Sequence, residues 1–243
     1  MSRPIEGPEA GGGARRQLKI AVDGPASSGK GTVARLVARQ LDYLWIDTGA
    51  LYRAVALTAR RRGVAWSSSE EVASLAEGLR VEWVRERGEE PKLLVNGEDL
   101  SLAVRAEEIG AGASIVAAIP RVRSALLGVQ RHLAARGGVV MDGRDIGTVV
   151  LPDAELKVYL DASLDERARR RWLQFPSRNY DAVRLDIAER DDRDRTRVVA
   201  PLCAAADALR LDTTDLPIEE AVTIIVGWAR ERGSGSVGTS GEG

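Results

Sequence analysis

The sequence predicts an α/β protein in which a five-stranded parallel sheet lies between two layers of helices. Five short apolar runs alternate with helical patterns along most of the chain, at residues 18–22, 43–46, 138–141, 156–160 and 209–211. Strands that alternate with helices in this way form parallel sheets covered on both faces. Between residues 79 and 102 the pattern changes to short strands around Asn96-Gly97, a hairpin-turn signal, which predicts a small antiparallel β insert.

The first of these apolar runs leads into a glycine-bounded loop. Residues 18–32 read LKIAVDGPASSGKGT, which places a G-x-x-x-x-G-K pattern between a strand and a helix. Glycine lets backbone N–H groups wrap around a phosphate, while the helix N-terminus and the Lys30 ammonium attract its charge. The sequence therefore predicts a P-loop three-layer sandwich rather than an ordinary glycine turn. The residues expected to bind a nucleoside triphosphate are Gly24, Pro25, Ala26, Ser27, Ser28, Gly29, Lys30, Gly31 and Thr32.

Helical patterns fill the segments between the strands. One helix is expected from the loop to about residue 40, and another from Thr48 to Arg60 with Thr48 as a plausible N-cap. Residues 107–136 predict two helices broken at Pro120, and residues 218–228 predict a closing amphipathic helix. Residues 1–16 and 233–243 have too little apolar content to pack and are expected to be disordered.

The composition argues against several classes of protein. The 243 residues include one cysteine, Cys203, and one histidine, His132, so we expect no disulfide framework, no zinc site and no Ser-His-Asp chemistry. His132 is expected on a helix surface. The net charge of -1 gives no reason to expect a nucleic-acid polymer or a membrane as partner, and neither a signal peptide nor a membrane-spanning apolar run is expected. These features are typical of a cytoplasmic protein.

A strongly charged segment extends from residue 165 to residue 197 and contains the run ERDDRDRTR. Such a run is usually a solvated helix with i,i+4 ion pairs. Its spacing also allows a function, because Arg190, Asp194 and Arg197 at i, i+4 and i+7 would lie on one helix face.

The motifs that are missing narrow the class of reaction. The sequence has no N-K-x-D element of a GTPase and no H-R-D segment of a protein kinase. What remains is a small-molecule kinase in which Arg53, Arg144, Arg190 and Arg197 hold an anionic acceptor, since guanidinium groups grip phosphate oxygens at two points. No general base is needed if the acceptor is a phosphate monoester, which is largely dianionic at pH 7. We expect Lys30, Arg144, Arg190 and Arg197 to be the catalytic groups.

Five stretches, in the correct order, carry a resemblance to a known family. They are AVDGPASSGKGT, IDTGALYR, ASIVAAIPRVR, MDGRDIGTVV and ERDDRDRTR. From about residue 18 to residue 232 the chain resembles bacterial cytidylate kinase, in the nucleoside monophosphate kinase group. The resemblance implies ATP as phosphoryl donor, Mg²⁺, and CMP or dCMP as acceptor. It also implies a core with monophosphate-binding helices (17–63, 107–162 and 198–232), a small β-containing insert (64–106) and a helical, mobile lid (163–197).

The resemblance assigns the acceptor contacts position by position. The family's phosphate contacts fall on Thr48, Arg53, Arg144 and Arg197, its cytosine contacts on Ser114, Arg123 and Asp145, and its ribose contacts on Arg190 and Asp194. Asp145 would accept a hydrogen bond from the cytosine amino group, whereas uracil would present a carbonyl oxygen there. Plainer alternatives are that Thr48 only caps a helix, that Ser114 and Arg123 are an ordinary helix residue and a surface charge, and that Arg144 pairs with Asp145.

The chain departs from the family pattern at three places. Thr48 stands where serine is expected, and the segment between Arg171 and Glu189 is a few residues short. Gly31 removes the usual metal-binding hydroxyl, which leaves Thr32 to contact Mg²⁺ through water.

We therefore predict a monomeric, ATP-dependent CMP or dCMP kinase. Two alternatives stay open: a P-loop kinase for another small acceptor, such as UMP, shikimate or pantoate, and a nucleotide-binding regulatory protein without turnover. A nucleic-acid-binding module is disfavoured because Asp191, Asp192 and Asp194 would repel a phosphate backbone.

Overall fold

The computed structural model describes residues 17–84 and 91–234, so the tail predicted at 1–16 and residues 235–243 of the tail predicted at 233–243 lie outside the described residues. Five strands form one parallel sheet in the order β2-β6-β1-β7-β8. The strands are β1 (Lys19–Asp23), β2 (Leu44–Asp47), β6 (Val139–Gly143), β7 (Leu156–Asp161) and β8 (Leu209–Asp212). Since β2–β6, β6–β1, β1–β7 and β7–β8 all pair in parallel, the predicted sheet is confirmed.

Helices cover both faces of this sheet because its strands are apolar on both sides. Helices α1 (Lys30–Leu41) and α8 (Ile218–Ser234) pack on the face that carries Ile20 and Val22. Helix α5 (Pro120–Ala134) and the short π-helix η2 (Ile146–Val150) pack on the face that carries Ala21 and Met141. Helix α8 ends at Ser234, so residues 233 and 234 belong to a helix and not to the predicted tail.

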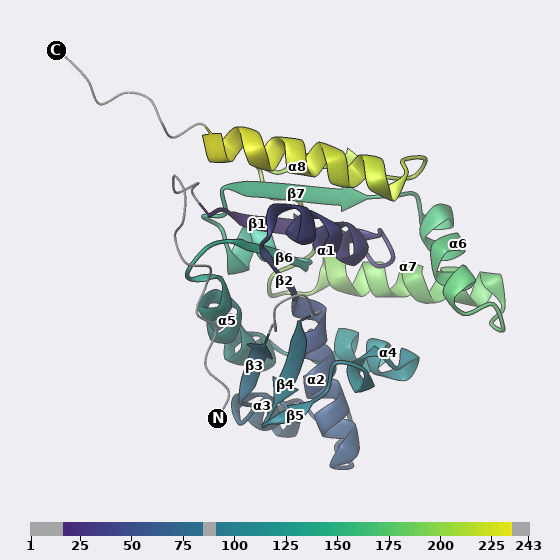
Figure 1. Ribbon diagram of the computed structural model, residues 1–243. Helices are drawn as coiled ribbons and strands as arrows, with labels where there is room; N and C mark the ends of the chain where they lie inside the picture. The colour runs from purple at the N-terminus through teal and green to yellow at the C-terminus, as the bar shows by residue number, and fades with distance from the viewer. Residues whose placement is uncertain (1–16, 85–90, 235–243) are drawn as a thin grey trace.

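The carboxyl ends of the strands meet at one edge of the sheet. In register, Asp47 of β2 lies opposite Asp142 of β6, and Asp23 of β1 lies opposite Gly143. Strand β7 points towards helix α6 (Leu164–Gln174), which packs against α7 (Tyr180–Thr196) beside this edge (Figure 1). The loops that follow the strands therefore converge at this edge.

A second group of elements packs around helix α2 (Thr48–Arg61), below the sheet in Figure 1. It contains α3 (Ser69–Glu77), η1 (Ala103–Arg105), α4 (Glu107–Val116) and an antiparallel sheet of β3 (Val81–Val84), β4 (Lys92–Val95) and β5 (Glu98–Asp99). Asn96 and Gly97 have φ values of 52° and 83°, which confirms the predicted hairpin turn. Helix α3 is not among the elements predicted from the sequence.

Two local predictions are wrong. The N-cap of α2 is Asp47, whose side chain accepts from Ala50 N–H, whereas the Thr48 hydroxyl donates to the Asp142 carbonyl. Helix α7 ends at Thr196, and Arg197 has extended backbone angles of -59° and 140°, so it does not continue the helix face of Arg190 and Asp194. Asp47 rather than Thr48 is the N-cap of α2 because the Asp47 carboxylate accepts from a backbone N–H of α2, whereas the Thr48 hydroxyl is turned towards β6.

His132 is exposed on α5, as predicted. Across residues 17–84 and 91–234, no single helix has the length and apolar character needed to cross a membrane. Within the same described residues, only α4 and α5 taken together meet that test, and they are bent by 104° at their break.

Candidate active site

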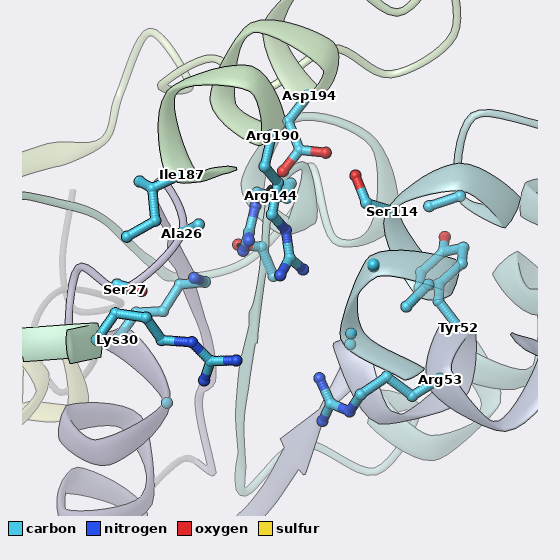
Figure 2. A pocket seen from close by; sticks show the side chains of 18 of the residues that line it. Ala26, Ser27, Lys30, Tyr52, Arg53, Ser114, Arg144, Ile187, Arg190 and Asp194 are labelled. Carbon is cyan, nitrogen blue, oxygen red and sulfur yellow. Dashed lines mark hydrogen bonds and ion pairs between the residues drawn. The ribbon is translucent and has the colours of Figure 1, made fainter. Parts of the chain in front are cut away.

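A cleft of about 1110 Å³ lies at the carboxyl edge of the five-stranded sheet. The phosphate loop lines one side, and α2 and α4 line the other. Figure 2 shows Lys30 and Ser27 on the loop side, Arg53, Tyr52 and Ser114 on the opposite side, and Arg144 with Arg190 between them. The predicted acceptor residues therefore face the same space as six of the predicted loop residues, whereas Gly24, Pro25 and Ser28 do not line the cleft.

The phosphate loop owes its shape to backbone conformations that glycine favours. Gly29 has φ 85° immediately before α1, and a Cβ on Gly24 would lie 2.0 Å from the Leu160 carbonyl oxygen. Gly24 is therefore required by its contact with β7, in addition to any approach of a phosphate. Ala26, Ser27, Lys30 and Thr32 line the cleft.

Lys30 is buried at the start of α1, and its Nζ donates to the Pro25 carbonyl at 2.9 Å. Burial, together with the nearby Arg144, lowers the pKa of Lys30 to about 7. A phosphate in the loop would reverse this effect, because an anion beside the ammonium favours its charged form.

A second buried group lies beside the loop, at the end of β6. The Asp142 Oδ1 accepts from Trp45 Nε1 at 2.8 Å, and a Cβ on Gly31 would lie 3.6 Å from Asp142 Oδ2. Burial, with the charge of Asp47, raises the pKa of Asp142 to about 7. The glycine at position 31 thus keeps the space in front of one carboxylate oxygen open.

Two arginines of the cleft are held by carboxylates. Arg53 Nη2 donates to Asp47 at 2.5 Å, and Arg144 Nε donates to Asp194 at 2.8 Å. Among the described residues, none accepts a hydrogen bond from the buried Nε of Arg190. Burial together with Arg144 lowers the pKa of Arg190 to about 10. An unpaired guanidinium nitrogen in a cationic cleft is a strong site for an anion.

A cluster of charged and polar side chains lies deeper on the α4 side. Asp145, which is 4% exposed, pairs with Arg123 and with Arg197, whose Nη2 lies 3.3 Å from Asp145 Oδ1. Arg123 is 7% exposed and lies over the ring of Tyr52, 5.5 Å from its centroid. Ser114 is 4% exposed and accepts a hydrogen bond from Arg193. Arg123 and Ser114 are therefore not ordinary surface residues, and Arg144 pairs with Asp194 rather than with Asp145.

The cleft brings together the predicted acceptor residues. Arg197 reaches Asp145 from outside α7, and Thr48 lines the cleft while its hydroxyl donates to the protein. Sequence reasoning did not assign a role to Asp142, Tyr52 or Arg193. The position of Asp142 directly after a buried strand was an available signal, whereas nothing local to Arg193 marks its contact with Ser114.

Proteins of known family resemble this chain over most of its length. The family model described as cytidylate kinase matches residues 20–231, which include every residue named in the cleft. The chain belongs to the cytidylate kinase family. A cytidylate kinase of Desulfitobacterium hafniense is 47% identical over 216 residues, covering 87% of this chain and 92% of that protein. A cytidylate kinase of Vibrio cholerae is 50% identical over 207 residues, covering 84% and 92%. The cytidylate kinase match extends from β1 to α8 and takes in the insert and the charged segment.

Proposed function

We propose that this chain transfers the γ-phosphoryl group of ATP to CMP or dCMP, giving ADP and CDP or dCDP. The observation that carries the proposal is that one cleft joins a phosphate loop to the buried cluster of Asp145, Arg123 and Ser114, with Arg144 and Arg190 between them. Family membership supports the same reaction, because the similar curated proteins are named cytidylate kinase.

The transfer needs little besides positioning and charge neutralisation. A phosphate oxygen of CMP attacks the γ-phosphorus, and the bond from that phosphorus to the oxygen bridging it to the β-phosphate breaks, so that ADP leaves with the electron pair. Lys30, Arg144, Arg190 and Arg197 stabilise the charge on the transferred group. No general base is required, since the second pKa of a phosphate monoester is about 6.

The acceptor would be held at both ends. Thr48 and Arg53 contact its phosphate together with Arg144 and Arg197. Thr48 can donate to the phosphate only after its hydroxyl proton rotates away from the Asp142 carbonyl oxygen, which now accepts it with 2.8 Å between the two oxygens. Arg190 and Asp194 would contact the ribose.

At the base end, donors and acceptors match cytosine. The Asp145 carboxylate accepts from the exocyclic amino group, while Arg123 donates to the ring nitrogen and carbonyl. Uracil would place a carbonyl oxygen against Asp145, which leaves two acceptors unpaired.

The residues around Asp142 fit a magnesium ion. Mg²⁺ prefers carboxylate oxygens and water, and Asp142 Oδ2 faces the open space at Gly31. Asp142 would hold the ion, with Thr32 contacting it through water. When bound, it would neutralise the phosphates of the donor.

Residues 163–197 act as a lid that closes over the two nucleotides and excludes water, which would otherwise accept the phosphoryl group. The enzyme works in the cytoplasm as a monomer. Its partners are nucleotides, with no membrane or nucleic-acid polymer involved.

The test is ADP production from ATP and Mg²⁺ with CMP, dCMP, UMP, AMP, GMP and shikimate offered separately. CMP and dCMP are expected to be used at least tenfold better than UMP, and Lys30→Met is expected to abolish turnover. Preference for another acceptor would leave the phosphate loop intact as a donor site but refute the acceptor assignment. No ADP release with any acceptor would instead support a regulatory protein.

A further inference from the structure

A hydrogen bond connects the two helices that face each other across the acceptor end of the cleft. Arg193 on α7 donates from Nη1 to Ser114 Oγ on α4, at 2.8 Å. The two residues are 79 positions apart, and both line the cleft. Figure 2 shows the Ser114 hydroxyl pointing from α4 into the cleft, towards the side on which Asp194 and Arg190 lie.

The direction of this bond is fixed by chemistry. A guanidinium group can only donate, whereas a serine hydroxyl has one proton and two lone pairs. Ser114 Oγ must therefore accept from Arg193, and its own proton has to point elsewhere.

No acceptor within residues 17–84 and 91–234 takes that proton. Serine and threonine in a helix often donate to the carbonyl four residues earlier, as Ser74 does to Glu70 at 3.0 Å and Thr223 does to Glu219 at 2.8 Å. Among the described residues, the Ser114 hydroxyl makes only one hydrogen bond, which it accepts from Arg193. The hydroxyl thus presents an unused donor to the cleft.

We propose that Arg193 is a specificity-determining residue that acts through Ser114, by fixing its hydroxyl as a donor towards the pyrimidine base. The inference rests on the proposed function. Ring nitrogen N3 of cytosine is an acceptor, whereas N3 of uracil carries a proton and is a donor. A Ser114 held as donor shares the N3 acceptor with Arg123, which also donates to the ring carbonyl, and it lies opposite the acceptor Asp145. This set of groups complements cytosine.

With Arg193 in place, one of the two Oγ lone pairs is taken, and the positive charge beside it opposes a second donor at the same oxygen. Without Arg193 both lone pairs are open and the hydroxyl is free to rotate. It can then accept from the N3 proton of uracil, or donate to the carbonyl one turn earlier in α4, and either arrangement removes its preference for cytosine. Arg193 is thus a positioning residue, because it acts on the base through Ser114.

The experiment measures kcat/KM with CMP and with UMP for Arg193→Met, Ser114→Ala and the double variant. Arg193→Met is expected to lower the CMP-to-UMP ratio by about 5- to 30-fold, the range for one lost or misdirected hydrogen bond. Ser114→Ala should lower it similarly, and the double variant should lie no lower than Ser114→Ala alone. Arg193→Gln, which keeps an N–H donor, should restore part of the ratio.

Arg195→Met is the matched control, since it removes the same charge from an exposed position of the same helix. It should leave the ratio unchanged. The inference would be overturned if the CMP-to-UMP ratio of Arg193→Met lay within twofold of the parent's. It would also be overturned if the double variant lowered the ratio by the product of the two single effects.

Two further outcomes are a variant that does not fold and a parent enzyme that does not prefer CMP. If Arg193→Met does not fold, Arg193→Gln and Arg195→Gln are compared instead. Equal CMP-to-UMP ratios of kcat/KM for these two variants would overturn the inference. A lower ratio for Arg193→Gln would support it. If the parent enzyme itself fails to prefer CMP, the proposed function has failed, which is a different result from an unchanged ratio in the variants.

Discussion

Arg167 on α6 and Asp191 on α7 form a buried ion pair against the phosphate loop. Asp191 accepts the N–H of Ala26 at 3.1 Å, and Arg167 donates to the carbonyl of the same residue at 3.1 Å. Both side chains are nearly inaccessible, at 4% and 2% exposure of the two residues. Both ends of the predicted lid segment (163–197) are therefore bound to the donor loop at one residue, Ala26.

Arg167→Met is expected to lower the free energy of unfolding by about 3 kcal/mol, because it leaves the Asp191 carboxylate buried without its charge partner. Chemical denaturation measures this loss. The control is Arg184→Met, which also breaks an α6–α7 ion pair, with Asp165, but at side chains that are 46% and 71% exposed. That variant should lose less than about 1 kcal/mol.

Combining Arg167→Met with Asp191→Leu should recover part of the stability lost in Arg167→Met, since no unpaired charge is then buried. Equal losses of unfolding free energy in Arg167→Met and Arg184→Met would show that the buried ion pair stabilises the chain no more than the exposed one.

Asp145→Asn is expected to lower the CMP-to-UMP ratio of kcat/KM by 10- to 100-fold, or about 1 to 3 kcal/mol. The asparagine amide can donate to the uracil carbonyl that the carboxylate repels. It also releases Arg123 and Arg197, which Asp145 now pairs. Asp207→Asn, at a side chain that is 65% exposed, is the control and should keep the ratio of the parent. An unchanged ratio in Asp145→Asn would contradict the base assignment.

Much of the fold was predictable because its signals are local. The apolar runs, the G-x-x-x-x-G-K pattern and Asn96-Gly97 each fix the structure of a few consecutive residues, and the structure confirms the strands, the loop and the hairpin. Asp142 and Asp145 follow the apolar run at residues 138–141, so a local signal for their position at a strand end was also present.

The contacts that organise the site were less predictable because they join distant residues. Ala26 and Asp191 are 165 positions apart, and neither residue type marks the other as its partner. Arg197 shows the reverse case: its i+7 spacing predicts a helix face, but the helix ends one residue earlier, and its side chain still reaches Asp145. Charge spacing alone could not reveal where α7 stops.

Gly24→Ala is expected to disrupt the phosphate loop, because its Cβ would lie 2.0 Å from the backbone oxygen of Leu160. Real Cβ atoms do not approach so closely, so β1 or β7 has to shift. We expect a loss of more than about 2 kcal/mol in the free energy of unfolding, within the range for strained or overpacked sites. Thermal or chemical denaturation measures it, together with the affinity for ATP.

Gly227→Ala in α8 is the matched substitution, since a Cβ there would meet no heavy atom within 4 Å. Alanine has the higher helix propensity, so this variant should gain up to about 1 kcal/mol. Equal effects of the two substitutions would refute the role of the Leu160 contact.

Because the carboxyl of Asp23 is buried, we expect its contribution to the free energy of unfolding to fall as the pH rises through about 6. Its two oxygens accept from Ile146 N–H at 2.8 Å and Gly147 N–H at 2.7 Å, yet burial dominates and raises its pKa from 3.8 to about 6. Between these values the folded chain binds a proton that the unfolded chain has released. This contribution is therefore fully present below pH 3.8 and is lost above about pH 6.

The loss assigned to Asp23 between pH 5 and pH 7 is about 1 kcal/mol of unfolding free energy. It is measured as the difference in pH dependence between the parent and Asp23→Asn, which has no proton to release, because titrations elsewhere in the chain cancel in that difference. A carboxyl ¹³C titration of Asp23 checks the cause directly. A midpoint near 4 would mean that the two backbone N–H groups outweigh burial, and the pH dependence of the parent and the variant should then coincide.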